Sequence, residues 1–336
     1  YQQFNYVDES RQNWANDAPR PLRTYVWYPA PANTEMHEIS FPPGQPIFIA
    51  GQAAKNAPLL QAKPKSPVVV MSHGPGGSGL QMMWLGRRLA EAGFIAAAVN
   101  HHGNTAAEPE YDARGFRLFW ERTTDLSKVI DQLLSEPSFK QSIDPNRIAA
   151  IGFSLGGYTV TALAGGRIDL ELFEQFCESK ERDTTCGPQN EFPEVDKEFQ
   201  KIVKKDPRVE QSIAKHNHSY SDPRIKAVVA LAPALGAAFT QESLNKIQMP
   251  MYFTVGGMDQ IAPAKTNAKH LAKSIPNAQF KIIHPNASHY TFLNACSEHG
   301  IQHVPLCQDD KSVIRDDFHQ EVAKEISYWL MEHLPR

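Results

Sequence analysis

The chain has 336 residues, with 34 lysines and arginines against 37 aspartates and glutamates, which gives a net charge of −3. This mixture of charges offers no electrostatic reason to expect nucleic acid or an anionic membrane surface as a partner. No apolar run approaches the ~20 residues of a membrane span. The length suits one large α/β domain, which we predict for residues 1–336.

Residues 1–65 are polar and rich in proline, and we expect an extended leading segment with one strand at 22–28. An alternation of apolar strands and amphipathic helices begins at residue 67. The expected strands are 67–72, 94–99 and 147–153, and the expected helices are 80–92 and 119–134.

The alternation pauses at residues 167–222, a charged stretch that we expect to be a cap-like insertion within the domain. It resumes with strands at 225–231, 251–255 and 280–283 and a closing helix from about 318 to 334. Short unbroken apolar strands between helices predict a mostly parallel sheet with helices on both faces. Ligands bind at the carboxyl ends of the strands in such sheets.

The third strand ends in Gly152-Phe153-Ser154-Leu155-Gly156, and a helix follows over 158–164. A serine on so sharp a turn needs a strained backbone, and glycines on both sides leave room for it. The turn exposes the hydroxyl and aims the next N–H at the same spot, as a serine nucleophile requires. This pattern arises by chance in roughly one chain in ten of this length, so the assignment of a serine nucleophile depends on finding a base and an acid elsewhere in the sequence.

Two later strand ends supply the partners. Asp259 follows the strand 251–255 after two glycines, and His289 lies in the loop after the strand 280–283. The chain order is therefore Ser…Asp…His, as expected for a nucleophile elbow. The alternative for Asp259 is that it only caps a helix. His284 competes with His289, which we prefer because the loop needs room to return over the serine.

The segments 152–156, 255–259 and 287–289 resemble the triad motifs of α/β-hydrolases. Residues 23–29 and 72–78 are similar to those of dienelactone-hydrolase-like and platelet-activating-factor-acetylhydrolase-like serine esterases. The resemblance covers most of the chain from about residue 20, apart from the insertion, and it implies the α/β-hydrolase fold. Dienelactone hydrolases proper use a cysteine nucleophile, so the serine argues against that activity.

The resemblance implies Ser154 as nucleophile, His289 as base and Asp259 as the acid that orients it. It also implies the backbone N–H of Leu155 as one donor to the oxyanion.

The second oxyanion donor normally follows the His-Gly of the first turn, and here that residue is Pro75, which has no N–H. We predict that the N–H of Gly76 takes over, with Gly74 as the less favoured choice. His73, in the same turn, is expected to stabilise the turn rather than to react.

Four cysteines form two close pairs, Cys177 with Cys186 and Cys296 with Cys307, without the C-x-x-C spacing of zinc or redox sites. A local disulfide would restrain each polar loop. The chain begins at Tyr1, as a protein does after signal-peptide removal. We predict a periplasmic or secreted protein. The alternative is a cytosolic enzyme whose four cysteines are free thiols.

The aromatic residues Trp84, Phe116, Phe119 and Trp120 could form an apolar acyl pocket. Their helical spacing fits a place in the hydrophobic core equally well. The histidine pairs 101–102 and 216/218 lack acidic partners in register, so we predict no metal site.

We predict a serine hydrolase that cleaves small-molecule carboxylic esters, with short acyl chains, through an acyl-enzyme and without a cofactor. The alternatives are a peptidase, amidase or polyester hydrolase on the same fold, and an inactive binding protein. The oligomeric state is left open by the sequence.

Overall fold

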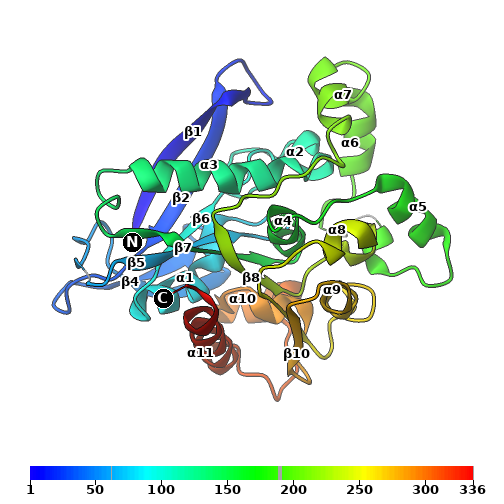
Figure 1. The fold of residues 1–336 in the computed structure, drawn as a ribbon. Coiled ribbons are helices and arrows are strands. Elements are labelled where there is room, and N and C mark those ends of the chain that lie inside the picture. Colours follow the sequence, from blue (N-terminus) through cyan, green and yellow to red (C-terminus); the bar gives the residue numbers. More distant parts are fainter. Residues whose placement is uncertain (62, 188–190, 336) are drawn as a thin grey trace.

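The computed structural model describes residues 1–61, 63–187 and 191–335. Its centre is an eight-stranded sheet in the order β1-β2-β6-β5-β7-β8-β9-β10 (Figure 1). These strands are β1 (Gln2–Gln12), β2 (Pro19–Trp27), β5 (Ser66–Ser72), β6 (Ile95–Val99), β7 (Ile143–Phe153), β8 (Ile225–Leu231), β9 (Met251–Gly256) and β10 (Ala278–His284). β1 pairs antiparallel with β2, and β2 with β6, whereas the six strands from β6 to β10 in sheet order are parallel.

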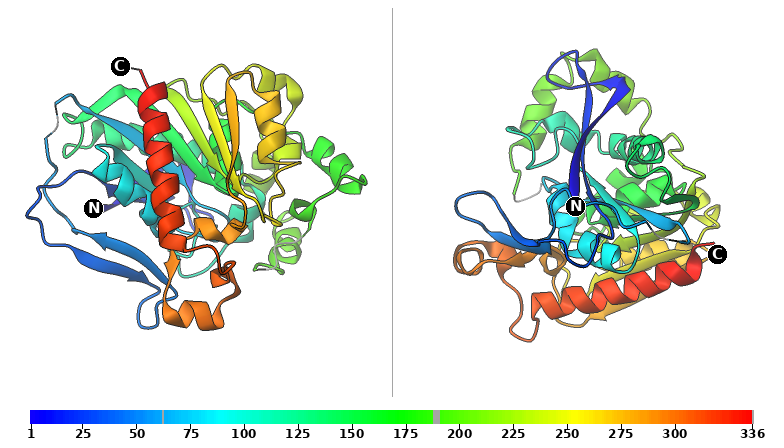
Figure 2. Two further views of the ribbon diagram at one scale, coloured as in Figure 1. Left: turned by 90° about the horizontal axis from the view of Figure 1, so that it is seen from below. Right: turned by 90° about the vertical axis from the view of Figure 1, so that its left-hand side faces the viewer.

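Helices cover both faces of this sheet, as the alternating pattern predicts. α1 (Met83–Glu91) and α11 (Arg315–His333) pack together on one face, which Figure 2 shows with α11 in front. α3 (Glu121–Ser135) and α4 (Leu155–Leu163) pack together on the other face, and α9 (Ala268–Ser274) contacts β9 and β10. Every residue of β5 and β6 is buried, because a parallel sheet between two helical layers has no solvent face.

The remaining elements are short. A second sheet has the order β11-β4-β3 and consists of β3 (His37–Phe41), β4 (Phe48–Ala53) and β11 (Ala295–Cys296). The short α-helices outside the insertion are α2 (Ala113–Arg117), α8 (Gln241–Asn245) and α10 (Glu298–His303). The 3-10 helices are η1 (Gly79–Met82), η2 (Thr184–Cys186), η3 (Gly236–Ala238), η4 (His289–Phe292) and η5 (Pro305–Cys307).

The prediction of a single strand in residues 1–65 was wrong, because this part of the chain forms β1 to β4. β1 is an edge strand with polar side chains and mostly exposed or half-buried positions, so it lacks the apolar run by which the parallel strands were found. Its antiparallel partner β2 supplies the hydrogen bonds instead.

Residues 167–222, called the cap segment below, lie between α4 and β8. They contain α5 (Leu170–Glu178), η2, α6 (Val195–Ile202) and α7 (Pro207–Ile213). Asp206, at the start of α7, is held by Arg208 and by Arg114 of α2 at 2.8 and 2.6 Å.

The tip of the β1–β2 hairpin supports the cap segment (Figure 1). Arg208 donates to the carbonyls of Asn13 and Trp14 at 3.0 and 3.1 Å. The guanidinium groups of Arg20, Arg114 and Arg208 all lie within 5.9 Å of the Trp14 ring centroid, a distance at which cations are attracted to the ring face.

Both predicted cysteine pairs are disulfides. Cys177 and Cys186 join α5 to η2, and Cys296 and Cys307 join β11 to η5. Among the described helices, none has both the length and the apolar character needed to cross a membrane.

Candidate active site

Ser154 stands on the sharp turn between β7 and α4, with φ +55° and ψ −117°. A side chain at this φ is strained, so the surrounding structure must impose it. The flanking glycines make this possible: a Cβ on Gly152 would lie 1.9 Å from the Gly156 carbonyl oxygen, and one on Gly156 would lie 2.0 Å from the Ser72 carbonyl oxygen. Neither position can hold a larger residue without moving backbone.

The loops that carry Asp259 and His289 pack directly against each other. The N–H groups of Gly257 and Met258 donate to the carbonyls of His284 and Ala287 at 2.9 and 3.0 Å. A Cβ on Gly256 would lie 2.2 Å from the Ala287 carbonyl oxygen, so the glycine allows this close approach.

The structure brings together the three side chains predicted as nucleophile, base and acid. The Ser154 Oγ lies 2.9 Å from His289 Nε2, and His289 Nδ1 lies 2.7 Å from Asp259 Oδ2. All three residues are buried, with exposed fractions of 5 %, 3 % and 8 %. His284 is half-buried, and its Nδ1 accepts the N–H of Asn286 within its own loop.

Hydrogen bonds around Asp259 fix the orientation of its carboxylate. Oδ1 accepts the backbone N–H groups of Ile261 and Ala262 at 3.0 and 2.8 Å, which leaves Oδ2 for the histidine. A carboxylate beside Nδ1 favours the tautomer that carries its proton there, so Nε2 is free to accept the serine proton. This arrangement is competent for nucleophilic catalysis.

The turn 73–77, called the oxyanion turn below, lies beside Ser154, since a Cβ on Gly74 would be 3.5 Å from the Ser154 Cβ. The N–H of Gly76 donates to the buried Asn104 Oδ1 at 2.5 Å. The role predicted for Gly76 therefore requires this N–H to leave Asn104. The N–H of Gly77 donates to the Gly74 carbonyl at 3.3 Å, and among the described hydrogen bonds the Gly74 N–H has no acceptor.

A buried polar network beneath this turn was missed by sequence reasoning. The His101 ring bridges Ser72 Oγ and Asp125 Oδ2, at 2.9 Å on each side. The backbone N–H of His101 donates to His73 Nε2, and the other ring nitrogen of His73 contacts the Gly74 carbonyl at 2.6 Å. His73 thus stabilises the turn as predicted, and His101 supports it from beneath.

Arg122 of α3 completes the network by donating to the His73 carbonyl and, at 3.3 Å, to Ser72 Oγ. Desolvation by burial is the main cause that lowers the pKa of His73 well below its ordinary value and the pKa of His101 to about 3. Both histidines are therefore neutral at physiological pH. The ion pair with Arg20 and the nearby Arg11 outweigh burial and hold the pKa of Asp125 well below its ordinary value.

A cavity of about 1410 Å³ opens onto Ser154 and His289. Its apolar wall includes Phe116, Phe119 and Trp120, so these three of the proposed pocket aromatics line it. Trp84 belongs to the core, where it stacks on His319 with ring centroids 4.2 Å apart. The cap segment supplies Leu170, Phe173, Phe192, Val195, Phe199 and Ile213 to the wall.

The cap segment touches the site at two points. The Phe192 ring covers the oxyanion turn, because a Cβ on Gly76 would lie 2.0 Å from its Cζ. The hydroxyl of Tyr290, the residue after His289, donates to the Glu191 carboxylate. Desolvation is the largest cause that raises the pKa of Tyr290, so this hydroxyl stays protonated as a donor.

The prediction that the pair 101–102 lacks acidic partners was wrong, because His101 contacts Asp125 and His102 contacts Glu108. His102 also accepts the Trp14 N–H, and His216 contacts the Ile213 carbonyl. Across the described ranges, no group of three or more His, Cys, Asp or Glu side chains is arranged to hold a metal ion.

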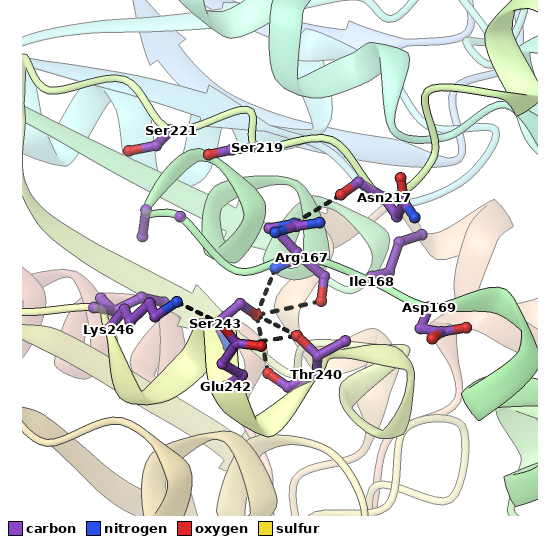
Figure 3. A pocket seen from close by; sticks show the side chains of 13 residues that line it. Arg167, Ile168, Asp169, Asn217, Ser219, Ser221, Thr240, Glu242, Ser243 and Lys246 are labelled. Atoms are coloured by element: carbon purple, nitrogen blue, oxygen red, sulfur yellow. Dashed lines mark hydrogen bonds and ion pairs between the residues drawn. The ribbon is translucent and has the colours of Figure 1, made fainter.

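A second pocket of about 430 Å³ lies beside α8, at the other end of α4 from Ser154 (Figure 3). Its polar groups bind one another: the backbone N–H of Arg167 donates to Ser243 Oγ, Arg167 Nε donates to the backbone carbonyl of Asn217, and Lys246 pairs with Glu242. Its described lining residues include no serine–histidine pair.

Part of the chain is similar in sequence to known proteins. Residues 57–171 match the dienelactone hydrolase family. The cutinase est1 of Thermobifida alba is 30 % identical over 105 residues, 31 % of this chain and 32 % of the cutinase. Protein phosphatase methylesterase 1 of Gibberella zeae is 38 % identical over 104 residues, 30 % of this chain and 25 % of the methylesterase. The chain thus covers about a third or less of the length of these curated relatives.

Solved structures extend the likeness to the whole chain. Ferulic acid esterase from Streptomyces cinnamoneus superposes with a TM-score of 0.61 at 17 % identity, covering 99 % of this chain and 89 % of the esterase. Thermogutta terrifontis esterase 2, phosphonylated by cyclosarin, gives 0.52 at 15 % identity and covers 99 % and 96 % of the two chains. This chain has the α/β-hydrolase fold, and its residues 57–171 match the dienelactone hydrolase family.

Proposed function

We propose that this chain is a serine hydrolase that cleaves carboxylic esters through an acyl-enzyme intermediate. The observation that carries the proposal is the continuous hydrogen-bonded series from Ser154 Oγ through the His289 ring to Asp259 Oδ2. The similarity to a cutinase and a methylesterase supports ester hydrolysis as the reaction class.

In the proposed mechanism Ser154 Oγ attacks the acyl carbonyl while His289 Nε2 takes its proton. Asp259 holds the imidazole in the required tautomer and stabilises the imidazolium. The alcohol leaves with a proton from His289, and the acyl group remains on Ser154. Water then attacks the acyl-enzyme by the same route and releases the acid.

The tetrahedral oxyanion needs two preorganised donors. We assign one to the N–H of Leu155, which follows the nucleophile at the start of α4. The other comes from the oxyanion turn, where Gly76 can serve only after its N–H leaves Asn104, and Gly74 can serve without breaking a described hydrogen bond.

The central test is the Ser154→Ala variant with p-nitrophenyl acetate as substrate. We expect no turnover above background and no labelling by a fluorophosphonate probe, because covalent capture requires an activated serine. Hydrolysis at the wild-type rate would refute the proposal. Comparing ester with anilide turnover on the wild-type protein separates an esterase from an amidase or peptidase.

We also propose that residues 1–336 form one domain, in which the cap segment 167–222 sets substrate size. The cavity of about 1410 Å³ exceeds the ~300–1,000 Å³ of typical ligand pockets. The predicted preference for short acyl chains therefore needs a direct check. A series of p-nitrophenyl esters tests it, and activity that rises steadily with chain length would contradict it.

The two disulfides support an oxidising compartment, and we propose that the protein is periplasmic or secreted. Thiol titration of protein isolated from its native cells would find no free thiol if this is right. Four titratable thiols would place the protein in a reducing compartment.

A further inference from the structure

The most unusual buried group outside the proposed triad is Arg122. Its side chain is 1 % exposed, and its Nε and Nη1 have no hydrogen-bond partner among the described residues. Within the described chain no carboxylate lies within 4.0 Å of its guanidinium. Burial lowers its pKa, since a cation loses its hydration there. A buried charge without a direct ion pair is destabilising, which raises the question of what role its contacts serve.

The contacts of Arg122 point to the oxyanion turn. Its Nη2 donates to the His73 carbonyl, which is the oxygen of the peptide bond that carries the Gly74 N–H. A charged donor on a carbonyl polarises the whole peptide group and makes its N–H a stronger donor. That N–H has no described acceptor, and Gly74 is the residue of the turn that lies against Ser154.

The neighbouring groups hold the cation without a direct ion pair. Asp125 attracts Arg122 from beyond 4.0 Å, while its own carboxylate is engaged by Arg11 at 2.5 Å and Arg20 at 2.8 Å. His101 stands between Asp125 and Ser72 Oγ, the other acceptor of Arg122. Arg122 therefore makes its hydrogen bonds to Ser72 and to the oxyanion turn.

We propose that Arg122 is a positioning residue that fixes and polarises the His73–Gly74 peptide, so that the Gly74 N–H serves as the second oxyanion donor in place of the N–H that Pro75 lacks. The inference rests on the proposed ester hydrolysis, and it accounts for the second donor to the oxyanion in that reaction. Arg122 acts through the peptide group and does not touch the substrate.

The test compares the variants Arg122→Met and Arg122→Lys. The lysine variant keeps the positive charge but loses the planar guanidinium group. The readouts are kcat and KM for p-nitrophenyl acetate and the rate constant of fluorophosphonate labelling, all measured below the melting temperature of each protein. We expect the methionine variant to lose about 10-fold or more in kcat and in labelling rate, with KM unchanged, because only the transition state carries the oxyanion. The lysine variant should lose less.

A matched control is Arg147→Met, in the first half of β7 and away from the strand end that carries Ser154. It should leave kcat unchanged. A folded Arg122→Met protein within twofold of wild type overturns the inference, as do equal losses in the lysine and methionine variants. A wild-type protein that is neither labelled nor active instead refutes the proposed function, and the inference falls with it.

Discussion

The change Asp259→Asn tests the proposed acid in a way that the structure makes specific. Oδ1 of Asp259 accepts two backbone N–H groups, from Ile261 and Ala262. An asparagine would keep its oxygen there, because turning the amide over leaves both N–H groups unbonded at about 1–3 kcal/mol each. Its NH₂ would then face His289 Nδ1, which must become an acceptor. The histidine proton moves to Nε2, and Ser154 loses its base.

The expected loss in kcat is large. An asparagine at the acid position of such a triad lowers kcat by about 10⁴, or about 5 kcal/mol of transition-state stabilisation. The assay is steady-state hydrolysis of p-nitrophenyl acetate together with fluorophosphonate labelling. The unfolding midpoint should change little, since the amide keeps the two backbone hydrogen bonds.

Asp169 provides a matched control, because its Oδ1 also accepts the N–H groups two and three residues later, at 2.9 and 3.2 Å. Asp169→Asn should leave kcat within about twofold of wild type, as it preserves the same local hydrogen bonds far from any base. If Asp259→Asn kept kcat within tenfold of wild type, another group would have to orient His289, and the assignment of the acid would be wrong.

Three further predictions concern the oxyanion turn, the buried histidines and the loop after the base. Asn104→Ala should lower kcat by about tenfold through loss of one buried hydrogen bond to the turn; unchanged or higher activity would instead identify Gly76 as the donor. Burial lowers the pKa of His319 in the folded protein. Below about pH 6.5 the unfolded chain therefore binds a proton that the folded chain does not, and the free energy of unfolding decreases as the pH is lowered. His319→Gln should reduce the slope of unfolding free energy against pH by about 1.4 kcal/mol per unit between pH 5 and 6, and equal slopes in urea titrations would contradict this. Replacing Cys296 and Cys307, 11 residues apart, by serine should cost about 3 kcal/mol of unfolding free energy, and an unchanged urea midpoint would argue against the constraint.

The parallel part of the sheet was predictable because its strands, apart from the mostly exposed β10, contain buried apolar runs. β8 was predicted with its observed bounds, since both faces are covered, a polar turn precedes it and Pro233 follows it closely. β1 could not be predicted in the same way. Its side chains alternate along an edge, and its pairing depends on β2, which lies across a turn of six residues.

The residues of the proposed triad could be located because each follows a strand end. The network around Arg122 could not, because charged residues in an amphipathic helix are expected on its solvent face. A signal was nevertheless present: Arg122 and Asp125 stand at helical spacing from Leu126 and Val129, on the buried stripe of α3. Two charged residues of opposite sign on the apolar stripe of a helix indicate a buried polar network, even where they do not contact each other.

The occupied N–H of Gly76 lay beyond sequence reasoning for a different reason. Pro75 revealed that one donor is missing, but the acceptor Asn104 lies 28 residues from Gly76 on another loop. Only the folded chain brings the two together.

The anchoring of the cap segment on the N-terminal hairpin has a consequence for protein engineering. Arg208 of the cap segment needs the carbonyls and the ring that Trp14 and Asn13 supply, nearly 200 residues earlier. A chimera that received the cap segment alone would keep the Asp206–Arg208 ion pair but lose the two backbone acceptors and the ring. The transferable unit is therefore discontinuous, and it joins the β1–β2 hairpin to residues 167–222.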